Sequence, residues 1–147
     1  MPACSQKLIY VLAASLWLGG LTFYALVVVP AGTEVVGSTT QGFITQRVTS
    51  RLNVVGAVCL AGLLLSTVPA RRRSLWIAWT LMAAAQAALF VMQNQLGALL
   101  DPLTQSVSDP ARFYSLHRVY LLITAVQWST CLWHLCESVW LWNREPT

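Results

Sequence analysis

The residues best suited to chemistry in this 147-residue chain are a histidine and a glutamate near its C-terminal end. His134 and Glu137 are three residues apart, so on a helix they lie on nearly the same face. An ionisable side chain inside an apolar stretch is a functional candidate, and this pair could relay protons or bind a metal. Two ligands are too few to form a metal site by themselves. The structural alternative is that Glu137 reaches the end of the stretch and pairs with Lys7 or a nearby arginine.

Three glutamines also lie inside apolar stretches, where an amide needs a hydrogen-bond partner. Gln86 and Gln93 are seven residues apart and share one face of a helix, and Gln127 belongs to the last apolar stretch. The three amides could line a polar path. We favour hydrogen bonds between helices instead, which contribute only about 0.5–2 kcal/mol per pair.

A third group of polar residues comes from segments that we expect at one end of the molecule. These candidates are Glu34, Arg47, Arg51, Asn53, Asp109, Arg112, His117 and Arg118. In a compact helix bundle they would come together and could form a pocket for an anion or a lipid headgroup. Equally, the two carboxylates could neutralise arginines and hold the loops in place. Both interpretations stay open, and this is where we expect a site if the chain has one.

Several kinds of functional site are not expected. His117 and His134 are the only histidines. On one helix they would be roughly 25 Å apart, at about 1.5 Å per residue, which is too far to ligate one haem. The sequence has no nucleotide-binding loop, no Ser-His-Asp motif and no cluster of carboxylates. We therefore predict no catalytic residue, no metal and no cofactor, and we do not expect an enzyme.

The composition of the chain explains why its few polar residues stand out. Of its residues, 56% are hydrophobic and only 10% are charged, whereas soluble domains are about a quarter charged. A soluble domain of this size has too much surface to hide so many apolar side chains. The sequence therefore predicts an integral membrane protein with one compact domain. The net charge of +4 does not indicate nucleic-acid binding.

Four apolar stretches are long enough to cross a bilayer as helices, which takes about 20 residues. We predict these helices at residues 8–29, 52–70, 74–100 and 110–142. Pro30 and Gly32 should end the first helix, and Asp109 should cap the last, with Pro110 in its first turn. Apolar residues at helical spacing around Phe43 suggest a short interfacial helix between helices 1 and 2. The predicted fold class is all-α, an antiparallel up-down four-helix bundle over residues 1–147.

Small residues at helical spacing should form packing surfaces, because they allow membrane helices to approach closely. They are Ser15 and Gly19 in the first helix, Gly56, Cys59, Gly62 and Ser66 in the second, and Ala84 and Ala88 in the third. We expect the cysteines to be reduced and to serve the same packing role.

The cations predict how the helices are oriented. Arg71, Arg72 and Arg73 form a triplet in a very short loop between two helices. The preference of arginine for the cytoplasmic side is strongest in such a loop. We therefore place the triplet and both chain termini in the cytoplasm, with the two longer loops outside, and we expect a plasma or inner membrane.

Four short motifs follow one another in a familiar order. They are Trp17-Leu18-Gly19-Gly20, Val28-Val29-Pro30, Arg51-Leu52-Asn53 and Arg112-Phe113-Tyr114-Ser115-Leu116-His117. In this order they resemble the transmembrane protein 205-like family, also called domain of unknown function 4149, over nearly the whole chain. The resemblance implies a small four-helix membrane domain and draws attention to His117. It implies no established reaction.

These observations favour an accessory or structural membrane protein that binds lipid or partner membrane subunits. The partner could also be another copy of the chain, in a homo-oligomer. The alternative is a small oligomeric transporter or channel that uses the Gln, Glu and His groups inside the membrane. A third interpretation, an enzyme acting on lipid, would depend on His117 and its neighbouring arginines alone. A transporter should gather its intramembrane polar groups around one cavity, whereas an accessory subunit should bury them in separate pairs.

Overall fold

The chain folds almost entirely into helices. A computed structural model describes residues 3–70, 72–101, 103–104 and 106–144. The elements are α1 (Ala3–Phe23), the π-helical turn η1 (Tyr24–Val28), α2 (Val29–Val36), α3 (Ser38–Ala70), α4 (Arg73–Gly97), β1 (Leu100–Asp101), β2 (Ser106–Val107) and α5 (Pro110–Trp142). Within these residues, four helical segments are long and apolar enough to cross a membrane. They are Ser5–Val36, Ser38–Leu65, Arg73–Gly97 and Pro110–Trp142.

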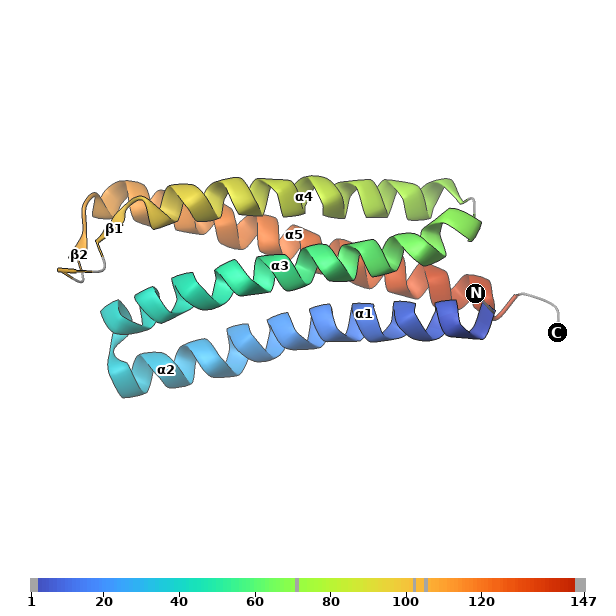
Figure 1. The fold of residues 1–147 in the computed structure, drawn as a ribbon, viewed down its shortest axis with the longest axis horizontal. Coiled ribbons are helices and arrows are strands. Elements are labelled where there is room, and N and C mark those ends of the chain that lie inside the picture. Colours follow the sequence, from blue (N-terminus) through green and yellow to red (C-terminus); the bar gives the residue numbers. More distant parts are fainter. Residues whose placement is uncertain (1–2, 71, 102, 105, 145–147) are drawn as a thin grey trace.

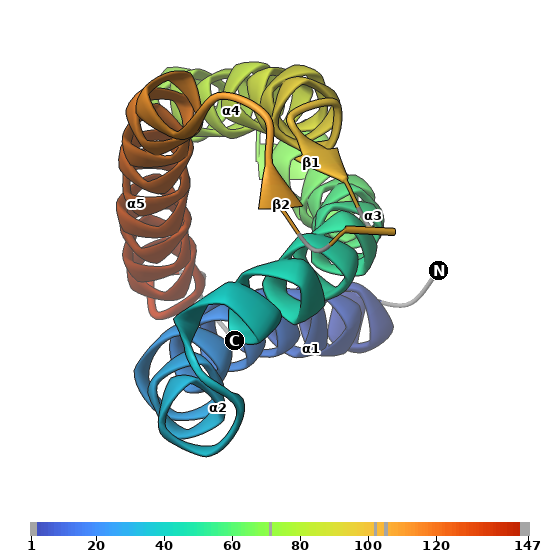
Figure 2. The ribbon, with the colours of Figure 1, turned by 90° about the vertical axis from the view of Figure 1, so that its left-hand side faces the viewer.

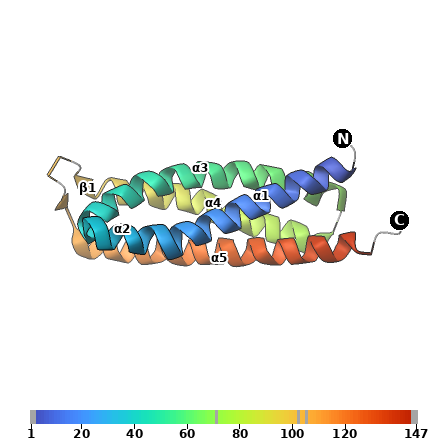
Figure 3. The same ribbon diagram turned by 90° about the horizontal axis from the view of Figure 1, so that it is seen from below.

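The long helices run alternately in opposite directions along one axis (Figure 1). The start of α1, the end of α3, the start of α4 and the end of α5 lie at one end of the molecule. We call this the arginine end, after Arg72, Arg73 and Arg144. Gly37 and the β1–β2 hairpin lie at the opposite end, which we call the loop end. In Figure 3, α1 and α2 run obliquely across the other helices.

The first helix does not end at Pro30, which corrects the sequence prediction. A proline inside a regular helix clashes with the carbonyl group four residues earlier, which here belongs to Leu26. That residue lies in the π-helical turn η1, whose wider spacing accommodates the proline, and α2 then continues from Val29 to Val36. The helix ends instead at Gly37, which has φ +80°. Only glycine adopts that conformation readily.

The predicted interfacial helix does not exist as a separate element. Residues around Phe43 belong to α3, which runs unbroken from Ser38 to Ala70. The reason is that this stretch carries inward-facing polar side chains that bind the neighbouring helix. Gln46 and Gln93 are hydrogen-bonded across α3 and α4, so the first turns of α3 pack against α4 and do not form a separate surface helix.

The last helix, α5, begins at Pro110, is capped by Asp109 and ends at Trp142, as predicted. The Asp109 side chain accepts a hydrogen bond from the Arg112 backbone N–H at 3.0 Å, and Pro110 occupies the first turn. The third predicted helix is shorter than expected, since α4 ends at Gly97 and β1 pairs antiparallel with β2. In the turn of this hairpin, hydrogen bonds from the Thr104 hydroxyl and the Leu103 N–H lower the pKa of the Asp101 carboxyl below its ordinary value.

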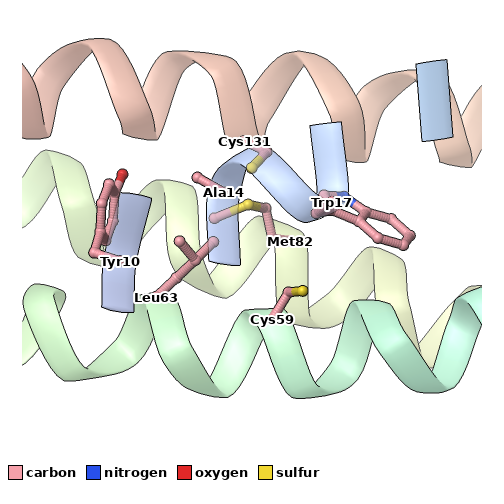
Figure 4. Packing of buried hydrophobic residues seen from close by; sticks show 7 residues of the cluster. All are labelled: Tyr10, Ala14, Trp17, Cys59, Leu63, Met82 and Cys131. Carbon is pink, nitrogen blue, oxygen red and sulfur yellow. The ribbon is translucent and has the colours of Figure 1, made fainter. Parts of the chain in front are cut away.

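The main apolar core lies in the half of the molecule nearer the arginine end. Its buried residues are Tyr10, Ala14, Trp17, Cys59, Leu63, Met82 and Cys131 (Figure 4). Two glycines of α3 make this packing close. A Cβ at Gly62 would lie 3.1 Å from the Cβ of Ala13, and one at Gly56 would lie 2.7 Å from the Trp17 ring. By contrast, Ser15 and Gly19 are exposed, and a Cβ at Gly19 would meet nothing within 4 Å.

Candidate functional site

A cavity of about 720 Å³ occupies the half of the molecule nearer the loop end. It lies between α5 on one side and α3 with η1 and α2 on the other, and α4 and both short strands complete its wall. The cavity exists because α5 is tilted. Its loop end lies beside α4 and away from α2, whereas its other end approaches α1 (Figure 2). The volume is within the range of about 300–1,000 Å³ that is typical of small-molecule sites.

The wall of the cavity is mostly apolar and aromatic, and its polar groups are hydroxyls, amides and one imidazole. Its aromatic residues are Trp17, Tyr24, Phe43, Phe113, Tyr114, Tyr120 and Trp128. The polar lining consists of hydroxyl groups, the amides of Gln41, Gln46, Asn53 and Gln93, and the imidazole of His117. Among the residues that the structure describes, no Asp, Glu, Lys or Arg lines the cavity. The site is therefore suited to an uncharged molecule with a large apolar part.

Asn53 is a buried polar residue of the cavity wall that accepts hydrogen bonds from two other helices. Its side-chain oxygen accepts a hydrogen bond from the Tyr120 hydroxyl at 3.2 Å, and its backbone carbonyl accepts one from Gln86 Nε2 at 3.0 Å. The Asn53 Nδ2 and the Tyr24 hydroxyl are buried without a hydrogen-bond partner. Each unpaired buried group costs about 1–3 kcal/mol of stability, which makes these two atoms unusual features of the cavity wall.

The cavity is open sideways between η1 and α5. Leu26 of η1 and Leu121 of α5 both line it, and they are 71% and 53% exposed. Toward the arginine end, the Trp128 Nε1 donates a 3.0 Å hydrogen bond to the Thr22 hydroxyl and closes the gap between α1 and α5. The exposed side chains of Leu26 and Leu121 therefore lie between this hydrogen bond and the loop end.

The eight polar residues predicted for this end of the molecule are divided between the cavity wall and the exposed surface. Only Asn53 and His117 line the cavity; His117 is half-buried, and its ring is parallel to that of Phe113 at 6.0 Å between centroids. The other six are exposed and do not line it: Glu34, Arg47, Arg51, Asp109, Arg112 and Arg118. The anion or headgroup pocket expected from the charges is therefore not formed by this cavity, because its helices turn their charged side chains outward.

The three glutamines make hydrogen bonds between helices, as expected. Gln127 Nε2 donates to Gln86 Oε1 at 2.9 Å, and Gln86 in turn donates to the backbone of Asn53. Gln93 forms a separate pair with Gln46 on the α4 side of the cavity. Of the three, only Gln93 lines the cavity itself.

His134 and Glu137 use different partners, so the structure does not join them into one site. The fully buried His134 ring lies between the Tyr10 hydroxyl, at 2.7 Å from Nδ1, and the Thr67 hydroxyl, at 3.0 Å from Nε2. Glu137 accepts a hydrogen bond from Ser74 at 2.8 Å and pairs with Arg72 at 3.1 Å. The pairing of Glu137 with a nearby arginine was the structural alternative. No group of three metal-ligating side chains occurs in the described residues.

Several residues of the cavity were not candidates in the sequence. Gln46 and Thr49 precede Asn53 at helical spacing, which would have placed them on its face had residues 38–51 been recognised as part of the same helix. Trp17 and Tyr24 are likewise seven residues apart on the first helical segment. The partnership of Tyr120 with Asn53 joins residues 67 positions apart, and no local pattern indicates it.

The comparisons with known proteins add no identification: no family model, curated protein or solved structure matches the chain. The resemblance to the transmembrane protein 205-like family stays a prediction.

Proposed function

We propose that the chain is an integral membrane protein that crosses the bilayer four times and binds an uncharged, lipid-soluble molecule in its cavity. The outer surface supports membrane insertion. Large apolar side chains are exposed along every long helix, among them Leu12, Val58, Leu81 and Leu122. In the most apolar window of each candidate span, only 17–28% of the residues are buried. Lipid is the solvent in which such faces are stable.

The observation that carries the binding function is a mostly apolar cavity whose lining includes exposed leucine side chains of η1 and α5 and no Asp, Glu, Lys or Arg among the described residues. On α5 the lining runs from Phe113 to Ser129, about 24 Å at 1.5 Å per residue, most of the thickness of a bilayer core. A molecule dissolved in the bilayer would reach the cavity between Leu26 and Leu121 without crossing water. The site thus suits a long apolar molecule better than a soluble metabolite.

We propose an accessory role for this lipid binding, in a plasma or inner membrane, with the arginine end in the cytoplasm. Arg72, Arg73 and Arg144 lie at that end, together with Lys7, which is over the Trp142 ring. The loop end carries as many cations, but Arg72 and Arg73 adjoin the very short connection between α3 and α4. The preference of cations for the cytoplasmic side is strongest in such a loop. Exposed apolar faces on all long helices would also be available to partner subunits or to a second copy of the chain.

The alternative, a small oligomeric transporter or channel, has less support. Its polar groups should meet in one cavity, but Gln86 with Gln127, Gln93 with Gln46, His134 and Glu137 have separate partners. Flux measurements on reconstituted protein and on Glu137→Gln would test this alternative. Flux that depends on Glu137 would favour it over the accessory role.

Native mass spectrometry of the full chain in mild detergent tests the proposed binding function. We expect a lipid adduct that survives detergent removal. Both Ala125 of α5 and Ala87 of α4 are exposed, but only Ala125 lines the cavity. Ala125→Phe adds a large side chain to the lining and should abolish the adduct, whereas Ala87→Phe should retain it. A well-folded protein without any adduct, or two variants that behave alike, would overturn the proposal.

A further inference from the structure

Of three buried polar atoms without a hydrogen-bond partner among the described residues, two belong to residues that line the cavity and indicate what the bound molecule must supply; the third, Gln127 Oε1, belongs to a residue outside the lining. Asn53 is 2% exposed and Tyr24 is 8% exposed, and both residues line the cavity. The Asn53 Nδ2 and the Tyr24 hydroxyl oxygen have no hydrogen-bond partner in the protein. Since buried polar groups in folded proteins nearly always have partners, a molecule in the cavity is the natural source of the missing one.

The hydrogen bonds of Asn53 determine which kind of partner is missing. Its carboxamide oxygen already accepts a hydrogen bond from the Tyr120 hydroxyl, and its backbone carbonyl oxygen accepts one from the Gln86 side chain. The remaining atom is the NH₂ group, which can only donate. The Tyr24 hydroxyl can donate as well. The bound molecule therefore needs a hydrogen-bond acceptor next to its apolar part.

The acceptor must also be uncharged. A phosphate or carboxylate group in this cavity would be removed from water without a cation beside it, because no Lys or Arg among the described residues lines the wall. Burial of an unpaired charge is far more costly than burial of a neutral polar group. A carbonyl oxygen meets both requirements, since it is neutral and accepts hydrogen bonds strongly.

We propose that the cavity binds a neutral lipid whose head carries a carbonyl oxygen, which accepts hydrogen bonds from Asn53 Nδ2 and the Tyr24 hydroxyl. The apolar chain of this lipid leaves through the opening between Leu26 and Leu121 into the bilayer. This inference rests on the proposed lipid-binding function and names the head group that the site recognises. Two lipid classes share this chemistry, the ester carbonyls of an acylglycerol and the ring carbonyls of a quinone.

A binding measurement on the full chain in detergent micelles tests which head group the cavity recognises. The probes are labelled dioleoylglycerol and a decyl-substituted benzoquinone. Each probe is compared with a matched molecule that lacks the carbonyl, a dialkyl glycerol ether and decylbenzene respectively. We expect at least one carbonyl probe to bind more tightly than its matched molecule, and the tighter of the two carbonyl probes identifies the lipid class.

Tyr24→Phe removes the unpaired hydroxyl and nothing else. It should weaken binding of the preferred carbonyl probe by about 2- to 10-fold, the effect of one hydrogen bond, and leave the carbonyl-free molecule unaffected. Because that hydroxyl has no partner in the protein, the Tm without ligand should not fall. Tyr10→Phe is the matched control: it lies outside the cavity and removes a hydroxyl bonded to His134. It should lower the Tm and leave binding unchanged.

A second variant tests Asn53 without leaving a new unpaired group. Asn53→Leu combined with Tyr120→Phe removes the amide together with the hydroxyl that binds it, and it should also reduce the preference for the carbonyl probe. Equal binding of carbonyl and carbonyl-free probes, unchanged by Tyr24→Phe, would overturn the head-group assignment and leave the lipid-binding function standing. If none of the four probes binds, and if Ala125→Phe does not change any lipid adduct seen by mass spectrometry, the proposed function itself is overturned.

Discussion

Gln46 and Gln93 bind each other's backbone across α3 and α4. The Nε2 of Gln46 donates to the Gln93 carbonyl oxygen at 3.1 Å, and the Nε2 of Gln93 donates to the Gln46 carbonyl oxygen at 2.8 Å. Thr49 adds a hydrogen bond to the Gln93 side-chain oxygen at 3.3 Å. This exchange fixes the first half of α3 to α4 and so holds one wall of the cavity in place.

Replacement of either glutamine by leucine should therefore weaken the packing of α3 on α4. We expect Gln46→Leu and Gln93→Leu each to lower the free energy of unfolding by about 0.5–2 kcal/mol, the range for hydrogen bonds between membrane helices. Thermal unfolding in detergent measures the effect. Gln95→Leu, at an exposed position of α4, is the matched control. Each change removes one side-chain donor and leaves both backbone acceptors in place, so the double variant should be less stable than either single variant; a double variant as stable as Gln46→Leu alone would contradict this picture.

Gly56 should be intolerant of any side chain, unlike Gly19. A methyl group at Gly56 would lie 2.7 Å from the Trp17 ring and from Gln86 Oε1, so the helices would have to separate. We expect Gly56→Ala to lower the free energy of unfolding by about 1–3 kcal/mol. Gly19→Ala meets nothing within 4 Å and should be neutral or stabilising by up to about 1 kcal/mol. Equal effects in an unfolding titration would show that α1 and α3 do not pack as described.

The long helices were predictable because each apolar stretch is about as long as a bilayer core or longer and carries few charges. The start of α5 was predictable because Asp109 and Pro110 act through local geometry. The behaviour of Pro30 was not, because the π-helical turn that accommodates it has no sequence signature. The continuity of α3 was missed for a related reason, since residues 38–51 look polar until their partners on α4 are known.

The candidate site was predictable only in part. The sequence indicated that the glutamines would bind between helices, but the partners include backbone carbonyls, such as that of Asn53, which side-chain patterns do not reveal. Asn53 and His117 line the cavity, whereas the charged residues near them in sequence point outward. A cavity depends on the tilt of α5 relative to the other helices, and this tilt is set by contacts between distant segments.

His134 should matter more for stability than Glu137, although both are ionisable residues of α5. His134 is fully buried with hydrogen bonds to Tyr10 and Thr67. His134→Ala would leave a cavity and two hydroxyls without a ring partner, so we expect a loss of about 2–4 kcal/mol. The Glu137 pair with Arg72 is partly exposed, and Glu137→Gln should cost at most about 1 kcal/mol. Chemical unfolding in detergent measures both, and the reverse order would contradict the structure.

The orientation proposed for the helices predicts which side of the membrane each end faces. In a chain with all cysteines replaced, Arg73→Cys marks the arginine end and Glu34→Cys, at an exposed position of α2, marks the loop end. A membrane-impermeant maleimide should label the cysteine at position 34 in intact cells and the one at position 73 only in inverted vesicles, because cations favour the cytoplasmic side. Labelling in the opposite sense would reverse the orientation and leave the four crossings intact. Labelling of both positions from the same side would contradict the crossing of the membrane by α3 itself.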